Sequence, residues 1–422
     1  MSNKKQQIPD IRFKGFTDDW EQRKLGELIN LENGFAFKSE YFQEDPSDVI
    51  VLTPGNVNIG GGFQSGKGRF YNIAGKFPDK FIFKPGDIFV TMTDLTPSGQ
   101  TLGLPAIVPD DGITYLHNQR LGKLVNFSGD REFLFYVFNT EDYHKHIVAT
   151  ASGTTVKHSS SSKILDYVVH IPIIEEQTKI GAFLNKLDNT IALHQRQLYY
   201  YKELKKATLQ KMFPREGETI PEVRFEGFTE EWEQRTLGEL MDISSASRVH
   251  KNEWTKSGVR FFRSSDVVAS YNKKKNTEAF ISHELYEELS SKSGKVSQGD
   301  ILITGGGSIG IPYLIKDEEP LYFKDADLIW LKNSEKLNGY FLFTYFITNG
   351  FRQYLGSISH IGTISHYTIE QAKVTPISLP NEKEQDQLGS FFEQLDNAIA
   401  LHQQKIINYQ TAKSALFKKM FV

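Results

Sequence analysis

Residues 175–213 read EEQTKIGAFLNKLDNTIALHQRQLYYYKELKKATLQKMF, and residues 383–421 read KEQDQLGSFFEQLDNAIALHQQKIINYQTAKSALFKKMF. Both stretches contain LDNxIALHQ, and in both the seam-forming residues recur at alternating steps of four and three. This spacing is typical of a coiled coil and predicts two long helices. At 1.5 Å per residue, ~37 residues form a rod about 55 Å long. The spacing selects the seam positions Ile180, Leu184, Leu187, Ile191, His194, Leu198, Leu388, Phe392, Leu395, Ile399, His402 and Ile406.

Each predicted helix needs a partner for its apolar seam, and the chain supplies one. Two related segments in one chain favour a pseudo-twofold arrangement, in which the helices run antiparallel. The step pattern predicts a centred register that sets His194 against Ile406, Leu198 against His402 and Ile180 against Met420. We interpret the histidines as polar seam residues that fix the register. A metal or catalytic role is the lesser alternative, because no cluster of carboxylates and histidines surrounds them in the sequence.

A second repeat precedes the helices. Residues 8–28 read IPDIRFKGFTDDWEQRKLGEL and residues 220–240 read IPEVRFEGFTEEWEQRTLGEL, so that fifteen of the 21 positions are identical. The chain therefore consists of a leading segment, an insert and a helix, followed by the same order again. The inserts, residues 29–172 and 241–380, have diverged, although Gly-Asp-Ile occurs at 86–88 and again at 299–301.

The repeats predict an α+β fold: two β-rich mixed domains joined by two long antiparallel coiled-coil helices. The domain boundaries that follow are 1–172 for the first leading segment and insert, 173–219 for the central helix and linker, 220–380 for the second leading segment and insert, and 381–422 for the last helix. One matched frame with two diverged inserts is typical of two modules that bind different targets.

The composition excludes several classes of protein. The chain has 422 residues, of which 39% are hydrophobic and none is cysteine, so disulfides, thiol nucleophiles and thiolate metal sites are excluded. No stretch approaches the ~18 apolar residues of a membrane span. The polar N-terminal stretch is unlike a signal peptide, so we expect a cytoplasmic protein without a membrane partner. A net charge of −3 is unlike that of a lone DNA-binding protein, so any contact with DNA must rest on local basic patches or on a partner.

Short apolar runs in both inserts, bounded by Gly, Pro and Asp, indicate strands at residues 49–52, 88–91 and 301–304, whereas residues 131–148 and 337–355 look helical. The loops carry side chains that suit nucleic acid, since Arg and Lys reach guanine, Asn and Gln reach adenine, and hydroxyls reach phosphates. A solvated loop residue is the simpler interpretation of any one of them; the indication lies in the clusters. The candidates for DNA binding are Lys38, Asn56, Asn58, Lys67, Arg69, Thr93, Gln100, Asn118, Arg120, Lys157 and His158 in the first insert, and Arg248, Arg263, Ser265, Lys273, Lys274, Ser308, His360 and His366 in the second.

Two glycine-rich runs nearly match nucleotide-binding motifs. Residues 305–310 fit GxGxxG, but the next residues indicate a strand where a dinucleotide site requires a helix, so a hairpin or a loop facing DNA is predicted. Residues 61–67 have the spacing of a P-loop, but Gly68 replaces the Ser or Thr that binds magnesium. No catalytic, cofactor or metal motif emerges, so we expect a non-catalytic chain.

The layout resembles the specificity subunits of type I restriction–modification systems over essentially the whole chain. The resemblance rests on the duplicated WEQRKLG (20–26) and WEQRTLG (232–238), on the Gly-Asp-Ile runs, and on a proline followed by Glu-Gln before each long helix. It implies two target recognition domains that bind the two parts of a bipartite double-stranded DNA site, and a helical spacer. The implied partners are two methyltransferase subunits, which use S-adenosylmethionine, and restriction or translocase subunits, which use ATP and Mg²⁺. It also implies the prokaryotic cytoplasm, with nucleoid association when the complex is bound to DNA.

Two other functions fit part of the sequence. A coiled-coil adaptor with two protein-interaction domains explains the helices and the charge, but not the matched frame with diverged basic loops. A self-contained DNA-modifying enzyme lacks its motifs. Co-purification with a methyltransferase would discriminate a specificity subunit from an adaptor.

Overall fold

The computed structural model describes residues 8–324, 328–333, 336–358 and 366–422. Contacts divide the chain into two compact units: unit 1 is Met1–Leu193 with Lys405–Val422, and unit 2 is His194–Gln404. Each unit thus contains one insert and a part of each long helix. Within the described ranges, no helix has both the length and the apolar character needed to cross a bilayer.

The short elements of unit 1 are mostly strands, with short helices between them. Their bounds are β1 (Glu21–Lys24), α1 (Leu25–Leu28), β2 (Asn30–Asn33), η1 (Ser39–Tyr41), β3 (Val49–Val51), η2 (Pro54–Asn56), β4 (Arg69–Phe70), η3 (Asp79–Phe81), β5 (Ile88–Thr91), β6 (Thr93–Asp94), β7 (Pro105–Ile107), β8 (Thr114–Leu116), β9 (Leu121–Val125), α2 (Arg131–Val137), α3 (Glu141–Thr150), β10 (Lys157–His158), α4 (Ser161–Leu165) and β11 (Val168–Ile171). One sheet has the order β2-β9-β5-β7 and another the order β4-β3-β8, while β1 pairs with β11 and β6 with β10. The strand predicted at residues 88–91 is β5, and the helical prediction at 131–148 becomes α2 and α3.

Unit 2 repeats this plan. Its short elements are β12 (Glu233–Thr236), α6 (Leu237–Leu240), β13 (Asp242–Ser244), η4 (Lys251–Glu253), β14 (Val259–Phe262), α7 (Ser264–Tyr271), β15 (Ala279–Ile281), α8 (His283–Ser293), β16 (Ile301–Thr304), β17 (Pro312–Leu314), β18 (Leu321–Phe323), β19 (Leu328–Lys332), α9 (Gly339–Tyr345), α10 (Asn349–Ile358), α11 (Ile369–Lys373) and β20 (Pro376–Leu379). The sheet β13-β19-β16-β17 corresponds to β2-β9-β5-β7, and β15-β14-β18 corresponds to β4-β3-β8. In both units the middle strand of the second sheet has one parallel neighbour, β3 with β8 and β14 with β18. The diverged inserts therefore share one topology.

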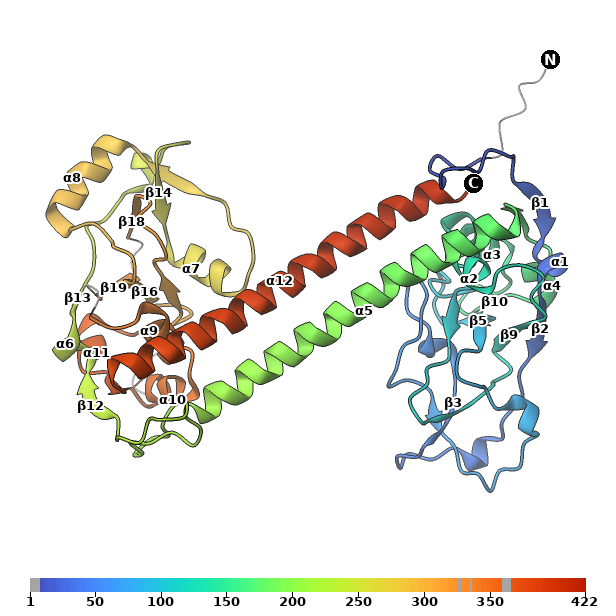
Figure 1. Cartoon of the computed structure of the whole chain (residues 1–422), viewed down its shortest axis with the longest axis horizontal. Helices are drawn as coiled ribbons and strands as arrows, with labels where there is room; N and C mark the ends of the chain where they lie inside the picture. Colours follow the sequence, from blue (N-terminus) through green and yellow to red (C-terminus); the bar gives the residue numbers. More distant parts are fainter. Residues whose placement is uncertain (1–7, 325–327, 334–335, 359–365) are drawn as a thin grey trace, which may run out of the picture. The chain divides into compact units, whose positions relative to one another are not determined.

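The two long helices are α5 (Ile174–Lys211) and α12 (Glu382–Met420), and they pack together in each unit (Figure 1). In unit 1, Ile180 shares a buried cluster with Met420, and Lys413 Nζ lies 2.5 Å from Asp188 Oδ1. In unit 2, Lys205 Nζ lies 2.6 Å from Asp396 Oδ1. In unit 1, residues later in α5 contact residues earlier in α12, so the helices run antiparallel there, as predicted.

Most of the predicted seam is buried. Within their units Ile180, Leu184, Ile191, His194, Leu388, Phe392, Leu395, Ile399 and His402 are buried, and Leu187, Leu198 and Ile406 are half-buried. The centred register set His402 against Leu198, and His402 contacts α5 on both sides of that position: its Nδ1 lies 3.0 Å from that of His194, and its ring stacks on Tyr201. A buried ring nitrogen needs a hydrogen-bond partner, and the other imidazole supplies one.

A glycine near the start of each long helix allows a short helix to approach it closely. Asp130 caps the N-terminus of α2, where its carboxylate accepts a hydrogen bond from Phe133 N, and Asn338 caps α9 and accepts from Phe341 N in the same way. A Cβ atom on Gly181 would lie 2.7 Å from Asp130 Oδ1, and one on Gly389 would lie 2.1 Å from Asn338 Oδ1. Any larger residue at these helix positions would displace the capping side chains.

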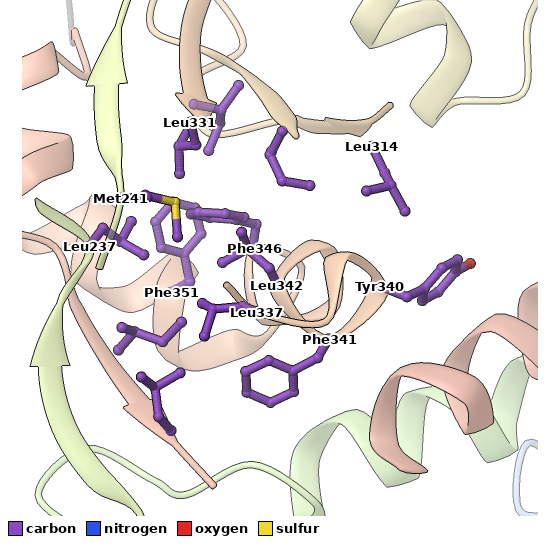
Figure 2. Close-up of a cluster of buried hydrophobic side chains, with 14 of the residues drawn as sticks. Leu237, Met241, Leu314, Leu331, Leu337, Tyr340, Phe341, Leu342, Phe346 and Phe351 are labelled. Atoms are coloured by element: carbon purple, nitrogen blue, oxygen red, sulfur yellow. The ribbon is translucent and has the colours of Figure 1, made fainter. Parts of the chain in front are cut away.

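The largest core of unit 2 gathers side chains from its sheets, its short helices and the long helices. Figure 2 shows part of it, and its labelled side chains include Phe341 and Leu342 of α9, Phe346 directly after this helix, and Met241 and Leu331. Phe213 stacks on Phe341 with ring centroids 5.8 Å apart. In unit 1, Phe421 stacks on Phe133 at 5.5 Å, so the ends of both long helices are anchored by the same kind of contact.

Candidate nucleic-acid interface

The framework that positions the loops is the same in both units. Arg12 donates through Nε and Nη2 to the carboxylate of Glu176, at 2.9 and 2.7 Å, and Arg224 does the same to Glu384 at 2.9 and 2.6 Å. The hydrogen bond with Glu176 raises the pKa of Arg12, so the guanidinium stays charged. Both carboxylates are almost fully buried, which makes each pair a fixed anchor between a leading segment and a long helix.

A second repeated contact ties each short helix to the long helices. Tyr136 donates its hydroxyl hydrogen to Asp188 and Tyr340 donates to Asp396, both at 2.7 Å. Each aspartate also accepts from a lysine, Lys413 in unit 1 and Lys205 in unit 2. Burial and the neighbouring aspartate raise the pKa of both tyrosines, so the hydroxyls remain donors at neutral pH. In Figure 2 the Tyr340 hydroxyl points away from the apolar cluster.

The leading segments are held in the same way at the far ends of the helices. Ile11 N donates to Lys419 O in unit 1, and Val223 N donates to Lys211 O in unit 2, both at 2.9 Å. In Figure 1 the first leading segment (dark blue) accordingly lies beside the end of α12 (red). The repeated sequences thus form a repeated set of contacts.

Most candidate residues of unit 1 are accessible. Lys38, Asn58, Lys67, Arg69, Gln100, Arg120 and His158 are exposed, Asn118 and Lys157 are half-buried, and Asn56 and Thr93 are buried. Asn56 accepts from Thr53 N and donates to Gln64 O, so its side chain shapes a turn. That Asn56 contacts DNA stays a prediction, and the burial of its side chain does not favour such a contact.

The structure brings together one cluster from distant parts of unit 1. The strands β6 and β10 pair, which sets Thr93 opposite His158 and Asp94 opposite Lys157. Thr93 Oγ1 lies 3.2 Å from His158 Nδ1. Gln100 belongs to the loop that follows β6, and the Cβ of a substituted Gly99 would lie 3.6 Å from Lys157 Cγ. The cation of Lys157, the imidazole of His158 and the amide of Gln100 thus gather at one strand pair and its loop, a set that suits phosphates and base edges, whereas the buried Thr93 positions the His158 ring.

Other candidates of unit 1 lie outside this cluster. The Arg69 guanidinium covers the ring of Phe42 at 3.8 Å, Asn58 donates to Phe63 O at 3.0 Å, and Asn118 Oδ1 accepts from Arg120 N at 2.9 Å. The run at residues 61–67 contains no helix, so it does not form a P-loop.

In unit 2 the candidates have more structural partners. Arg263 donates to Asp266 from Nε at 2.8 Å. Burial alone would raise the pKa of Asp266, but the hydrogen bonds and charges of Arg263 and the charge of Arg260 outweigh it and lower the pKa. Lys273 Nζ donates to Gln403 of α12 at 3.1 Å. Arg248, Ser265, Lys274, Ser308 and His366 are exposed, and His360 lies outside the described residues. Ser308 belongs to the predicted glycine-rich loop, which joins β16 to β17 as a hairpin.

The sequence interpretation missed Asp94 and Asp266, whose carboxylates hold their loops through several hydrogen bonds. It also missed the exposed Leu95 and the tyrosine–aspartate pairs. Asp94 had a local signal, because hydroxyl residues follow it at 96 and 101 in a turn-rich run that contains Pro97 and Gly99. The tyrosine–aspartate pairs join residues far apart in sequence and had none. Among the described residues, no group of three or more histidine, aspartate and glutamate side chains could hold a metal ion.

The geometry defines a protein of two homologous domains on paired helices, in which the frame is constant and the loops differ. The family model of the type I restriction modification DNA specificity domain matches residues 17–205 and again residues 229–409. Together the two matches cover most of the chain, which therefore belongs to this family and carries the domain twice.

Relatives and solved structures agree with the family. The chain is similar to a putative type I restriction enzyme specificity subunit of Haemophilus influenzae, with 33% identity over 169 residues, 39% of this chain and 40% of the relative. It is also similar to the EcoBI specificity subunit of Escherichia coli, with 23% identity over 318 residues, 71% of this chain and 63% of the relative. The chain thus spans less than two thirds of either relative's length. A crystal structure of a type I system S subunit from M. genitalium shares the fold, with a TM-score of 0.63, 16% identity and coverage of 98% of this chain and 99% of that one.

Proposed function

We propose that this chain directs a DNA methyltransferase to a bipartite sequence, with each unit reading one half. The observation that carries the proposal is the contrast within each unit. The buried Arg–Glu and Tyr–Asp–Lys contacts recur, whereas the loops of the inserts differ in length and in sequence. A constant frame with variable loops presents two different surfaces in the same manner, as two half-sites of different sequence require.

The long helices offer matching apolar positions for two copies of one partner. In unit 1 the side chains of Leu193 and Ile407 are exposed, and in unit 2 those of Leu401 and Tyr199. Leu193 and Leu401 occupy equivalent places in the repeat, as do Tyr199 and Ile407. Exposed apolar side chains that recur at equivalent positions of the repeat suit the binding of two copies of one partner. They support the docking of two methyltransferase subunits that carry S-adenosylmethionine, with further restriction subunits using ATP and Mg²⁺.

Partners also account for the net charge of −3. A protein that neutralises phosphates alone needs a basic surface, because phosphate contacts dominate affinity for DNA. Methyltransferase subunits that close around the duplex would share these contacts, so the chain itself supplies mainly the reading of the bases. The uninterrupted helices, of 38 and 39 residues, would set the length of the unread gap.

The test is a map of adenine methylation in cells that carry this chain and its methyltransferase. We expect a two-part motif with a gap of fixed length, and co-purification of the chain with the methyltransferase. Replacing residues 29–172 with the insert of another family member should change one half of the motif, and replacing residues 241–380 should change the other. Change in both halves, or in neither, would contradict the assignment of one half to each unit.

The helices provide a separate test of spacing. Lengthening α5 and α12 together by one heptad each should widen the gap and leave both half-sites unchanged. If the chain purifies without a methyltransferase, and if neither the chain nor its co-purifying partners bind DNA, the result would support the coiled-coil adaptor instead.

A further inference from the structure

An exposed leucine follows the most tightly organised aspartate of unit 1. Leu95 is 63% exposed, whereas Asp94 beside it is 3% exposed. The loop from residue 95 to residue 101 joins β6 to the turn that precedes β7. An apolar side chain of this size is usually tucked under its own loop when the loop has room to adjust, because its burial is favourable.

This loop has no such room, because Asp94 fixes both of its ends. Asp94 Oδ1 accepts from the backbone and the hydroxyl of Thr96, each at 2.7 Å. Asp94 Oδ2 accepts from the backbone and the hydroxyl of Thr101, at 2.5 and 2.8 Å. Burial alone would raise the pKa of Asp94, but these hydrogen bonds outweigh it and lower the pKa, so the carboxylate is charged at neutral pH.

Three further contacts hold the loop from outside. Thr91 donates its hydroxyl hydrogen to Thr101 O, and His144 Nε2 lies 3.1 Å from Gly99 O. The pairing of β6 with β10 fixes the residues just before the loop. The exposure of Leu95 is therefore built into the fold. Its loop carries Gln100 and directly follows β6, which pairs with Lys157 and His158 of β10.

Resting on the function proposed above, we propose that Leu95 is a wedge that inserts between stacked base pairs in the half-site read by unit 1. Apolar side chains such as leucine open base steps in this way, and the cost of unstacking is offset by added contacts to the bent duplex. The surroundings favour DNA over a protein partner. A protein interface buries a contiguous apolar patch, whereas the strand pair that precedes Leu95 carries Lys157 and His158, and its own loop carries Gln100, side chains that suit phosphates and base edges.

Unit 2 differs at the equivalent place. Its loop between β16 and β17, residues 305–311, is shorter, and both of its isoleucines, Ile309 and Ile311, are half-buried against cores of the unit. The tip presents Gly307 and Ser308. A glycine-rich tip allows the backbone to approach a duplex closely without opening it. The wedge should therefore distort one half-site and leave the other stacked.

The experiment uses the complete complex of the chain with its methyltransferase, bound to duplexes of the mapped motif. One base at a time is replaced by 2-aminopurine, whose fluorescence rises when it is unstacked, and the methylated adenine is left out. We expect a rise at one step of the half-site read by unit 1 and none at the corresponding positions of the other half. Leu95→Ala should abolish the rise and weaken binding about tenfold, whereas Leu95→Met should keep both near the original values.

Two further variants sharpen the test. Ile73 is a similarly exposed residue of unit 1, 72% exposed, and Ile73→Ala should change neither fluorescence nor affinity. Asp94→Asn keeps the leucine but removes charge from the carboxylate that fixes the loop, so the fluorescence rise should become smaller.

The outcomes separate the wedge from the proposed function. If the original complex binds the two-part site but no step in the half read by unit 1 brightens, or if Leu95→Ala behaves like the original protein, the wedge is wrong and the function stands. If Leu95→Ala prevents assembly with the methyltransferase, Leu95 contacts protein and the wedge is also wrong. A complex with no two-part specificity overturns both.

Discussion

The two units make the same buried contacts in their frames and differ in the loops of their inserts. Trp20 packs edge-on against Phe133 with ring centroids 6.0 Å apart, and Trp232 packs against Phe341 at the same separation. Between the paired strands β3 and β4, unit 1 has a 3-10 turn and a glycine-rich loop, whereas unit 2 has the helix α7 between β14 and β15. The comparison teaches that the frame dictates how a surface is presented, and that the loops can change without changing the frame.

The largest test of this equivalence concerns the buried ion pairs. Glu176→Ala and Glu384→Ala each leave an arginine buried without its carboxylate, which should cost about 3–5 kcal/mol of the free energy of unfolding of the affected unit. The two costs should agree, because the pairs have the same geometry and burial. Urea unfolding of each variant measures them.

Glu27→Ala serves as the control, because its ion pair with Arg23 is partly exposed. It should leave the free energy of unfolding almost unchanged, because an exposed ion pair contributes little to stability. A cost for Glu384→Ala well below that for Glu176→Ala would show that the frames are not equivalent.

The next test concerns the tyrosine–aspartate contacts. Tyr136→Phe and Tyr340→Phe each remove a hydrogen bond to a carboxylate, which should cost about 1.5–3 kcal/mol at neutral pH. Burial and the aspartates raise the pKa of both tyrosines in the folded protein. Their contribution to stability is therefore complete below the unfolded pKa of about 10 and is lost as pH rises above it.

Unfolding free energies between pH 7 and pH 11 would check this sign. The original protein should lose more stability above pH 10 than either variant. Tyr199→Phe alters an exposed ring of α5 and should match the original protein throughout. A variant that loses stability in parallel with the original protein would contradict the role given to the hydroxyl.

The smallest expected effect is electrostatic and tests the loops. Lys157→Ala in unit 1 and Lys274→Ala in unit 2 should each lower the slope of log affinity against log salt by about 0.9 if each lysine meets one phosphate. Affinity for the motif and for unrelated duplexes should weaken alike. Lys295→Ala removes a lysine already paired with Glu287 at 2.9 Å and should leave the slope unchanged. A loss confined to the motif would instead indicate contact with a base.

Local sequence patterns predicted a large part of this fold. The heptad spacing predicted both long helices and most of their buried residues, and short apolar runs predicted β5 and β16. Such local patterns predicted less of the candidate interface with DNA. Thr93 and His158 are 65 positions apart and meet only through the pairing of β6 with β10. The organising role of Asp94 depends on the positions of Thr96 and Thr101 around one carboxylate, which composition alone does not reveal.

The sequence by itself determined that the chain is one plan used twice, because repeats and heptads are periodic signals that survive without any tertiary contact. It also determined that the inserts had diverged. Only the tertiary structure decided that these inserts share one strand order, because a sheet tolerates many apolar residues at each buried position and so retains its topology as identity fades. Only the tertiary structure decided which loop residues are exposed and so able to contact bases. Asn56 and Gln100 both carry amide side chains in polar, turn-rich runs, but Asn56 is buried and Gln100 is exposed.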